Sequence, residues 1–261
     1  CARLRGLPDL VRALIPEAPP ILAPEIDVEG GTWKVTSAVL ELGLHFTRNP
    51  LRIRKAVEQA QAAGKEYEEL LASGVAMPDA LAMISIGEQS AAADVPMYAD
   101  AARTGEGESL RIALVGHAYN LYDEYVNHRL IARLEALGVT LLASDAVTAA
   151  AAAESLAKHT LKHYWTFERE LVGAAAYHLE HGTVDGMVAV VSFACGPDAV
   201  MLETLSELAG QYGVPVLNLI LDEHTGEAGL ITRIEAFVDV LVRRKALAAA
   251  RAAPVGGTKL P

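Results

Sequence analysis

From residue 109 onward, apolar and polar positions follow two alternating patterns. Four continuous apolar runs have the length of strands: LRIALVG at 110–116, GVTLLASD at 138–145, GMVAVVSFA at 186–194 and VPVLNLILD at 214–222. After each run, apolar residues recur every three or four positions, as in helices, at 121–137, 149–181, 199–213 and 228–243. Buried strands that alternate with helices predict an α/β fold with a doubly wound parallel sheet.

Residues 1–108 show a different pattern, dominated by helical spacing. We expect helices after Pro8, over 33–46 and over 50–73, with a proline in the first turn of the first and the third. The proline-rich segment 18–26 is a candidate for a short strand.

The segment TGEGES, at 104–109, has the composition of a linker. The change of pattern at this point indicates a domain boundary. We therefore expect an N-terminal domain at 1–108, a C-terminal domain at 109–243 and a tail at 244–261.

Composition and charge narrow the class of protein. Hydrophobic residues make up 52% and charged residues 21%, which is enough for a sizeable core. The net charge of −11 argues against a nucleic-acid partner. No apolar run reaches the ~20 residues of a membrane helix, and no secretory signal is evident. We expect a cytoplasmic protein without membrane contact.

The chain begins with Cys1, as mature lipoproteins do. Such proteins usually continue into a polar tether, whereas helical spacing follows here. We expect upstream residues to be missing instead. The only other cysteine is Cys195. Two cysteines build no disulfide framework, and a four-cysteine zinc site within one chain is excluded, although a mixed cysteine–histidine site stays open.

Polar residues gather where three predicted strands end: GHAYN at 116–120, CGPD at 195–198 and DEHTGE at 222–227. In an open parallel sheet, ligands bind beyond the carboxyl ends of the strands. We therefore expect the functional site at this edge. His117 is a candidate there, and its alternative role is to hold the turn.

Cys195 stands between a strand and a helix that Pro197 helps to start. A helix N-terminus favours the thiolate, which metals and electrophiles require. The alternative is a small buried apolar residue. The DEHTGE motif could bind a cation, a water or a phosphate group, or could be an ordinary loop before a helix.

His159 and His163 are spaced as helical metal ligands can be, but no glutamate completes an HExxH motif and Lys162 would repel a cation. A basic and aromatic face that binds an acidic ligand, or a dimer contact, fits this segment better.

Five motifs occur in order: CARLRGLPD at 1–9, GHAYNLYD at 116–123, HYWTF at 163–167, VDGMVAVVSFACGPD at 184–198 and LDEHTGEAGLITRIEAFVD at 221–239. Together they resemble the acyl-CoA dehydratase activase-related proteins. These are relatives of the cluster-carrying subunits of 2-hydroxyacyl-CoA dehydratases, benzoyl-CoA reductases and double-cubane cluster proteins. The resemblance implies two flavodoxin-like, Rossmann-like lobes around an iron–sulfur cluster, the N-terminal one partly helical and incomplete here.

The resemblance also implies roles for individual residues. Cys1 and Cys195 become ligands of an iron–sulfur cluster of the [4Fe-4S] or double-cubane type, with Gly196 and Asp198 beside it. The family's further upstream cysteine motif is absent, and Ala2 stands where the family often has proline. Because a cubane takes about four ligands, completion requires an upstream cysteine, other ligand types or a symmetric dimer.

On the substrate side of such a cluster, the candidate catalytic residues are His117, Tyr119 and Glu223. The implied function is that of an anaerobic electron-transfer protein, as a component of an ATP-dependent reductase or dehydratase. It would take low-potential electrons from an ATP-dependent activase and reduce a small molecule or a CoA thioester. We expect a homodimer, since relatives assemble in pairs.

Two other functions remain open. One is a regulatory or scaffold module without redox chemistry, which binds an activase or a CoA-type ligand. The other is a hydrolase or lyase that uses His117, Asp222, Glu223 and His224 around a divalent ion.

Overall fold

The computed structural model describes residues 6–26, 31–86, 109–159 and 165–252. The chain divides into two compact units, Cys1–Glu68 and Glu69–Pro261. Each unit is described by itself. The linker expected at 104–109 falls almost entirely outside the described residues, so the boundary at residue 108 stays a prediction.

The N-terminal unit is built from helices α1 (Leu7–Leu14), α2 (Gly31–Leu44) and most of α3 (Pro50–Ser73). Asn49 begins α3, since its Oδ1 accepts hydrogen bonds from the N–H groups of Leu51 (3.0 Å) and Arg52 (3.4 Å). The strand considered at 18–26 is wrong, because this segment has no regular secondary structure. Its three prolines cannot donate to a strand ladder. Residues 6–26 and 31–68 contain no second sheet.

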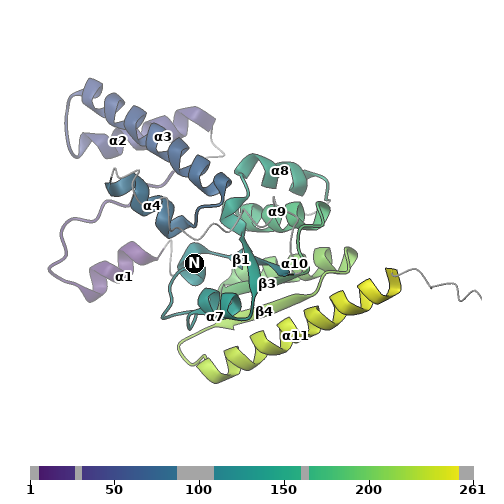
Figure 1. The fold of residues 1–261 in the computed structure, drawn as a ribbon. Helices are drawn as coiled ribbons and strands as arrows, with labels where there is room; N and C mark the ends of the chain where they lie inside the picture. Colours follow the sequence, from purple (N-terminus) through teal and green to yellow (C-terminus); the bar gives the residue numbers. More distant parts are fainter. Residues whose placement is uncertain (1–5, 27–30, 87–108, 160–164, 253–261) are drawn as a thin grey trace, which may run out of the picture. The chain divides into compact units, whose positions relative to one another are not determined.

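The second unit contains the sheet, preceded by α4 (Met77–Ile86) (Figure 1). Its strands are β1 (Leu110–Gly116), β2 (Val139–Ala143), β3 (Gly186–Ser192) and β4 (Val216–Leu221). All pairings are parallel, and the strand order is β2-β1-β3-β4. Each strand begins or ends within two residues of the apolar run that predicted it, and β1 and β3 are buried almost throughout.

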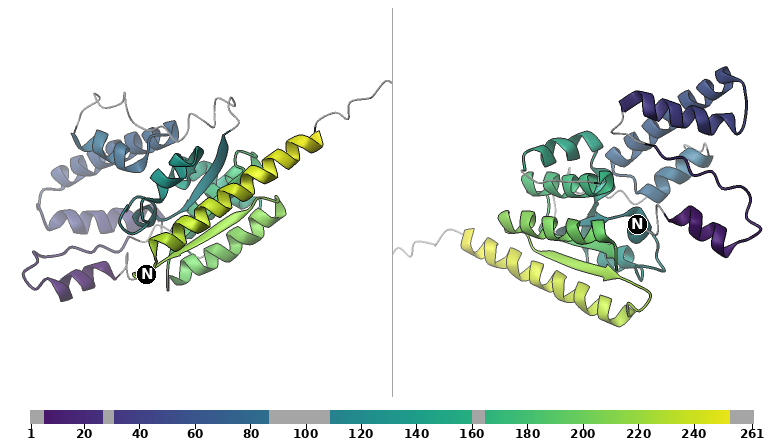
Figure 2. Two further views of the ribbon diagram at one scale, coloured as in Figure 1. Left: turned by 60° about the horizontal axis from the view of Figure 1, so that its bottom comes forward. Right: turned by 180° about the vertical axis from the view of Figure 1, so that it is seen from behind.

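Helices cover both faces of this sheet, so the predicted doubly wound α/β fold is confirmed. Ile112 and Leu114 of β1 pack on one face with α6 (Ala118–Leu121), α7 (Leu130–Ala136) and α11 (Glu227–Ala252). Ala113 and Val115 pack on the other with α8 (Ala149–Ala157), α9 (Thr166–Glu180) and α10 (Gly196–Gln211). Successive side chains of a strand point to opposite faces, and this alternation separates the two cores. Figure 2 shows α10 and α11 on opposite sides of β4.

Three helices differ from their predicted bounds by more than three residues or are divided. The helix expected over 121–137 begins at Leu130, after His128 and Arg129 adopt positive φ values of 53° and 61°. The helix expected over 149–181 is two helices, α8 and α9. The last helix runs to Ala252 instead of ending near residue 243.

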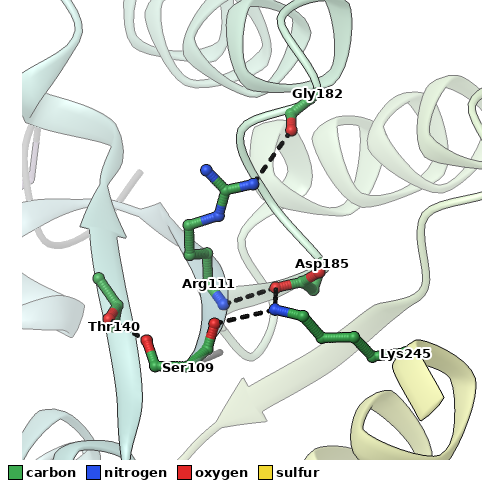
Figure 3. Close-up of polar contacts among 6 residues, drawn as sticks. All are labelled: Ser109, Arg111, Thr140, Gly182, Asp185 and Lys245. Carbon is green, nitrogen blue, oxygen red and sulfur yellow. Dashed lines mark hydrogen bonds and ion pairs between the residues drawn. The ribbon is translucent and has the colours of Figure 1, made fainter. Parts of the chain in front are cut away.

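The amino edge of the sheet is joined to α11 by a polar cluster around Asp185 (Figure 3). Asp185 Oδ2 accepts hydrogen bonds from the backbone N–H of Arg111 (2.8 Å) and from Lys245 Nζ (3.3 Å). Lys245 Nζ also donates to the carbonyl of Ser109 (3.0 Å). These bonds link β1, β3 and α11, and Lys245 lies beyond residue 243, where the last helix was expected to end.

Within the described parts of the chain, no helix is both long and apolar enough to cross a membrane.

Candidate functional site

The carboxyl ends of β1 and β3 lie side by side, and their loops form a buried pair. His117, directly after β1, has its Nε2 2.9 Å from Oδ1 of Asp198 in the first turn of α10. The Asp198 side chain is 2% exposed and that of His117 is 12% exposed. The connection from β1 goes to β2 on one side, whereas β3 lies on the other. This is the topological switch point, where doubly wound sheets bind ligands.

Asp198 connects the two strand ends through both carboxylate oxygens. Oδ2 accepts a hydrogen bond from the backbone N–H of Ser192, the last residue of β3, at 3.3 Å. Oδ1 is the partner of His117. A carboxylate in the first turn of a helix is also favoured by the helix dipole. The position of Asp198 therefore follows from the start of α10, and its partner follows from the strand order.

Two aromatic rings hold the imidazole of His117. Tyr119 stacks on it, with ring centroids 5.1 Å apart and planes 14° apart. Phe167 of α9 meets it edge-on at 5.7 Å. Ser192, whose N–H bonds to Asp198, donates its Oγ–H to Asn120 Oδ1 at 3.0 Å, and both residues are buried. The ring of His117 is thus held on several sides, which suits a residue that must present one nitrogen in a defined direction.

Cys195 is half-buried and precedes the first residue of α10. Ala194 before it has φ 60°, a left-handed conformation that costs energy for a residue with a Cβ. Burial raises the pKa of the Cys195 thiol, and the Asp198 carboxylate also raises it, whereas the backbone N–H of Asp198 favours the thiolate. The expected lowering of this pKa is therefore wrong. The helix start does act on the sulfur, but burial and a neighbouring carboxylate outweigh it.

Gly196 begins α10 directly after the cysteine. A Cβ at this position would meet no atom within 4 Å. The space above the helix start is open, and packing does not require glycine there.

The loop after β4 divides the DEHTGE motif between two roles. Asp222 Oδ1 accepts hydrogen bonds from Thr225 Oγ1 (2.8 Å) and from the backbone N–H of His224 (3.0 Å). The hydrogen bond from Thr225, as the largest cause, lowers the pKa of Asp222. The side chains of Glu223 and His224 are 82% and 86% exposed, and Glu223 Oε1 lies 3.8 Å from His224 Nε2. Asp222 and Thr225 thus build the turn itself, and Glu223 faces solvent rather than the His117–Asp198 pair.

A family model, that of the CoA enzyme activase uncharacterised domain, matches residues 1–147. The match covers more than half of the chain. The chain belongs to this family. No curated protein matches it. The family match confirms the resemblance to acyl-CoA dehydratase activase-related proteins and covers His117 and Tyr119, while Cys195 and Asp198 lie beyond its end.

In this activase-related chain, the ligand set for a metal is incomplete among the residues that the structure describes. Those residues contain no group of three or more histidine, cysteine, aspartate or glutamate side chains placed to hold a metal ion. The divalent-ion hydrolase hypothesis therefore has no site among them. Cys1 and His163 lie outside the described residues. His159 Nε2 lies 3.4 Å from Glu180 Oε1, at the opposite end of α9 from His117.

Two acidic residues near the same carboxyl edge, Asp145 and Glu170, were not among the predicted site residues. Tyr122 Oη donates a hydrogen bond to Asp145 Oδ2 at 2.8 Å, just after β2. Burial raises the pKa of Asp145, and the bond from Tyr122 opposes this. Burial also raises the pKa of Glu170 in α9, which the nearby charge of His117 counteracts. Asp145 is the last residue of the apolar run at 138–145, so the sequence placed it in a strand, whereas β2 ends at Ala143 and leaves Asp145 in the loop.

Proposed function

We propose that this chain is the electron-transfer component of a CoA enzyme system, in which Cys195 supplies one thiolate ligand to an iron–sulfur cluster. It would receive low-potential electrons from an ATP-dependent activase and pass them to a CoA thioester or another small substrate. Membership of the CoA enzyme activase domain family supports a role of this chain in a CoA enzyme system. We place this component in the cytoplasm, where thiols stay reduced.

The observation that carries the proposal is the position of Cys195. It is a half-buried thiol at the carboxyl edge of the sheet, beside the switch point and at a helix N-terminus. A metal replaces the thiol proton, so the raised pKa lowers cluster affinity without preventing ligation. The backbone N–H of Asp198 favours negative charge on the sulfur, as hydrogen bonds to cluster sulfurs do.

The described residues fit such a cluster only in part. They hold one thiol, whereas a cubane takes about four ligands. The proposal therefore requires Cys1, which lies outside the described residues, or ligands from another chain. When bound, the cluster would supply one-electron transfer at low potential.

The residues around Cys195 have roles that do not depend on the cluster. Asp198 accepts from Nε2 of His117, which leaves Nδ1 as the nitrogen that can accept or deliver a proton. Tyr119 and Phe167 keep the ring in place and exclude water from two of its sides. Glu223 can contact only what approaches from solvent. In this proposal His117 handles a substrate proton, and Asp198 orients His117.

The test is the iron and sulfide content of the full natural protein isolated without oxygen. The wild type should be brown and contain both elements. Cys195→Ser should lose most of the iron, while Ser206→Ala, on the exposed side of the same helix, should keep it. A colourless, iron-free wild type, or equal iron in Cys195→Ser, would reject the proposal.

The family membership is equally compatible with a second function: a module without redox chemistry that binds an activase or a CoA-type ligand. Its test is calorimetric titration of the same protein with CoA, an acyl-CoA and candidate activases. Binding by an iron-free protein that Cys195→Ser leaves unchanged would support this second function. The absence of binding to any of them would count against it.

A further inference from the structure

The strand β4 forms an open edge of the sheet. In the described part of the chain it pairs with β3 alone, as the last strand in the order β2-β1-β3-β4. Ile220, near the end of β4, is a large apolar residue that is 49% exposed. An open strand presents backbone N–H and C=O groups that a further strand can bind.

Hydrogen bonds to β3 show which backbone groups of β4 point outward. The N–H of Met187 donates to the carbonyl of Pro215 at 2.9 Å, and the N–H of Phe193 donates to the carbonyl of Leu221 at 2.8 Å. Successive residues of a strand direct their backbone groups to opposite sides, so the odd-numbered residues bond to β3. The even-numbered residues from 216 to 220 therefore direct their N–H and C=O groups away from the sheet.

The course of the chain after β4 leaves this edge open. The chain reaches β4 from β3 through α10, and crossovers between parallel strands are right-handed. A further strand beyond β4 would therefore need its helix on the face that carries α10. The helix that follows β4, α11, packs on the opposite face with α7 (Figure 2). In the described residues, the chain thus turns back across the sheet instead of adding a strand beside β4.

Two arginines of α11 reach this edge. Arg233 donates a hydrogen bond to the outward carbonyl of Asn218. Arg244 donates to the carbonyl of Gly213, shortly before β4 begins, at 2.7 Å. A guanidinium group has several N–H donors, so each arginine can bind a carboxylate as well. The edge is therefore flanked by positive charge on the side of α11.

The other side of the edge is apolar. Leu217, Leu219 and Leu221 pack in the core with α11, whereas Val216 packs in the core with α10. Side chains alternate along a strand, so the exposed side chain of Ile220 lies on the α10 side, like that of Val216. A strand that matches this edge has acidic residues on the side of the arginines and apolar residues on the other side.

We propose that β4 binds an extended segment of a partner protein in which acidic and apolar residues alternate, and that this segment adds a fifth strand to the sheet. The acidic residues of the segment face Arg233 and Arg244, and the apolar residues pack near Ile220. In such strand addition, main-chain hydrogen bonds supply affinity, and the alternating side chains supply specificity.

Charge favours a different protein over two other occupants of the edge. Pairing of two β4 strands would bring Arg233 and Arg244 of both copies to one interface, and like charges opposite each other destabilise a strand pair. The C-terminal residues 253–261 contain Lys259 and no acidic side chain. Neither a second β4 edge nor this tail therefore complements the arginines.

A capped peptide in which glutamate and valine alternate is the probe, and fluorescence anisotropy measures its binding to the full chain. It should bind with a dissociation constant of about 100 μM or lower. The same peptide with lysine in place of glutamate should bind at least about tenfold more weakly. N-methylation of all backbone amides of the glutamate peptide should abolish binding, because it removes the donors of the strand ladder.

Variants of the protein test the role of the two arginines. Arg233→Ala with Arg244→Ala should raise the dissociation constant of the glutamate peptide about fivefold or more. The matched control Arg243→Ala removes a neighbouring exposed cation and should leave the constant unchanged. In nuclear magnetic resonance spectra, the bound peptide should slow the hydrogen exchange of the outward amides of Asn218 and Ile220.

Three results would overturn the proposal. Absence of binding at up to about 1 mM peptide would show that the arginines only shield the edge. Binding that the N-methylated or the lysine peptide reproduces would show that no specific strand is added. Protection of the Ile220 amide that rises with protein concentration would assign the edge to a second copy. Cys195→Ser should bind the peptide like the wild type, so this test is independent of the proposed iron–sulfur function.

Discussion

The N-terminal helices and the sheet unit of this chain use apolar side chains in opposite ways. Among the described residues up to Glu68, Ile53 is the one buried hydrophobic residue, while eleven large hydrophobic side chains are exposed. In the sheet unit, β3 is buried along its whole length. Burial of apolar area is the main driving force of folding. Burial of apolar side chains therefore stabilises the sheet unit strongly and contributes much less to the described N-terminal helices.

The largest expected contrast comes from truncating a leucine in each region. Leu205→Ala, at a position 0% exposed in α10, should lower the free energy of unfolding by about 3 kcal/mol, because it leaves a cavity. Leu14→Ala, at a position 70% exposed in α1, should change it by less than about 0.5 kcal/mol. Urea denaturation followed by circular dichroism measures both. Equal losses would mean that the N-terminal helices have a core of their own.

Acid should weaken the sheet unit through one buried histidine. His178 is 6% exposed, and Thr183 Oγ1 donates to its carbonyl, so Nδ1–H donates to Thr183 at 2.9 Å. Nε2 then has a lone pair with no partner among the described residues. Burial, assisted by His181, lowers the pKa of His178 to about 4.

The sign of this effect follows from proton binding. Between pH ~6.5 and about 4, the unfolded chain binds a proton that the folded chain does not, so stability falls with falling pH. The loss should reach about 3 kcal/mol near pH 4. Urea midpoints measured across this range should fall in the wild type and fall less in His178→Leu. The same dependence in both proteins would contradict this role of His178.

Replacing a glycine by alanine should have opposite effects on stability in the two regions, because the sheet unit is closely packed. A Cβ at Gly173 in α9 would lie 2.5 Å from the backbone oxygen of Ala152, so Gly173→Ala must separate α8 from α9 and should cost about 1–3 kcal/mol. A Cβ at Gly64 in α3 would meet nothing within 4 Å, and Gly64→Ala should stabilise by up to about 1 kcal/mol. Thermal midpoints should therefore shift in opposite directions, and a shift in the same direction would refute the contrast.

The smallest expected difference between the two regions comes from removing one carboxylate in each. Asp185→Ala removes the acceptor of the Arg111 N–H and of Lys245, and should cost about 1–2 kcal/mol (Figure 3). Glu58→Ala breaks an exposed pair within one helix and should cost only about 0.3–0.5 kcal/mol. Chemical denaturation of the two variants measures the difference. Indistinguishable losses would show that the Asp185 cluster does not hold α11 to the sheet.

Local sequence patterns predicted the strands well because each is apolar throughout. They predicted helix ends less well, because individual side-chain hydrogen bonds act at the ends of these helices. His128 and Arg129 are left-handed, and the N–H of Leu130 directly after them donates to Asn127 Oδ1, so α7 starts late. Lys245 holds α11 to the amino edge, which no local pattern reveals. Periodicity reports which residues are apolar, but not where side-chain hydrogen bonds begin or end a helix.

The amino-acid order alone determined the alternation of buried strands and helices, and with it the edge of the sheet where a ligand can bind. It also determined that Cys195 directly precedes a helix, since strand length and proline position are local properties. Only the tertiary structure decided that His117 meets Asp198, a contact that depends on β1 and β3 becoming neighbours. It likewise decided the raised pKa of the Cys195 thiol and the solvent exposure of Glu223, because burial and charge at a site come from residues distant in the chain.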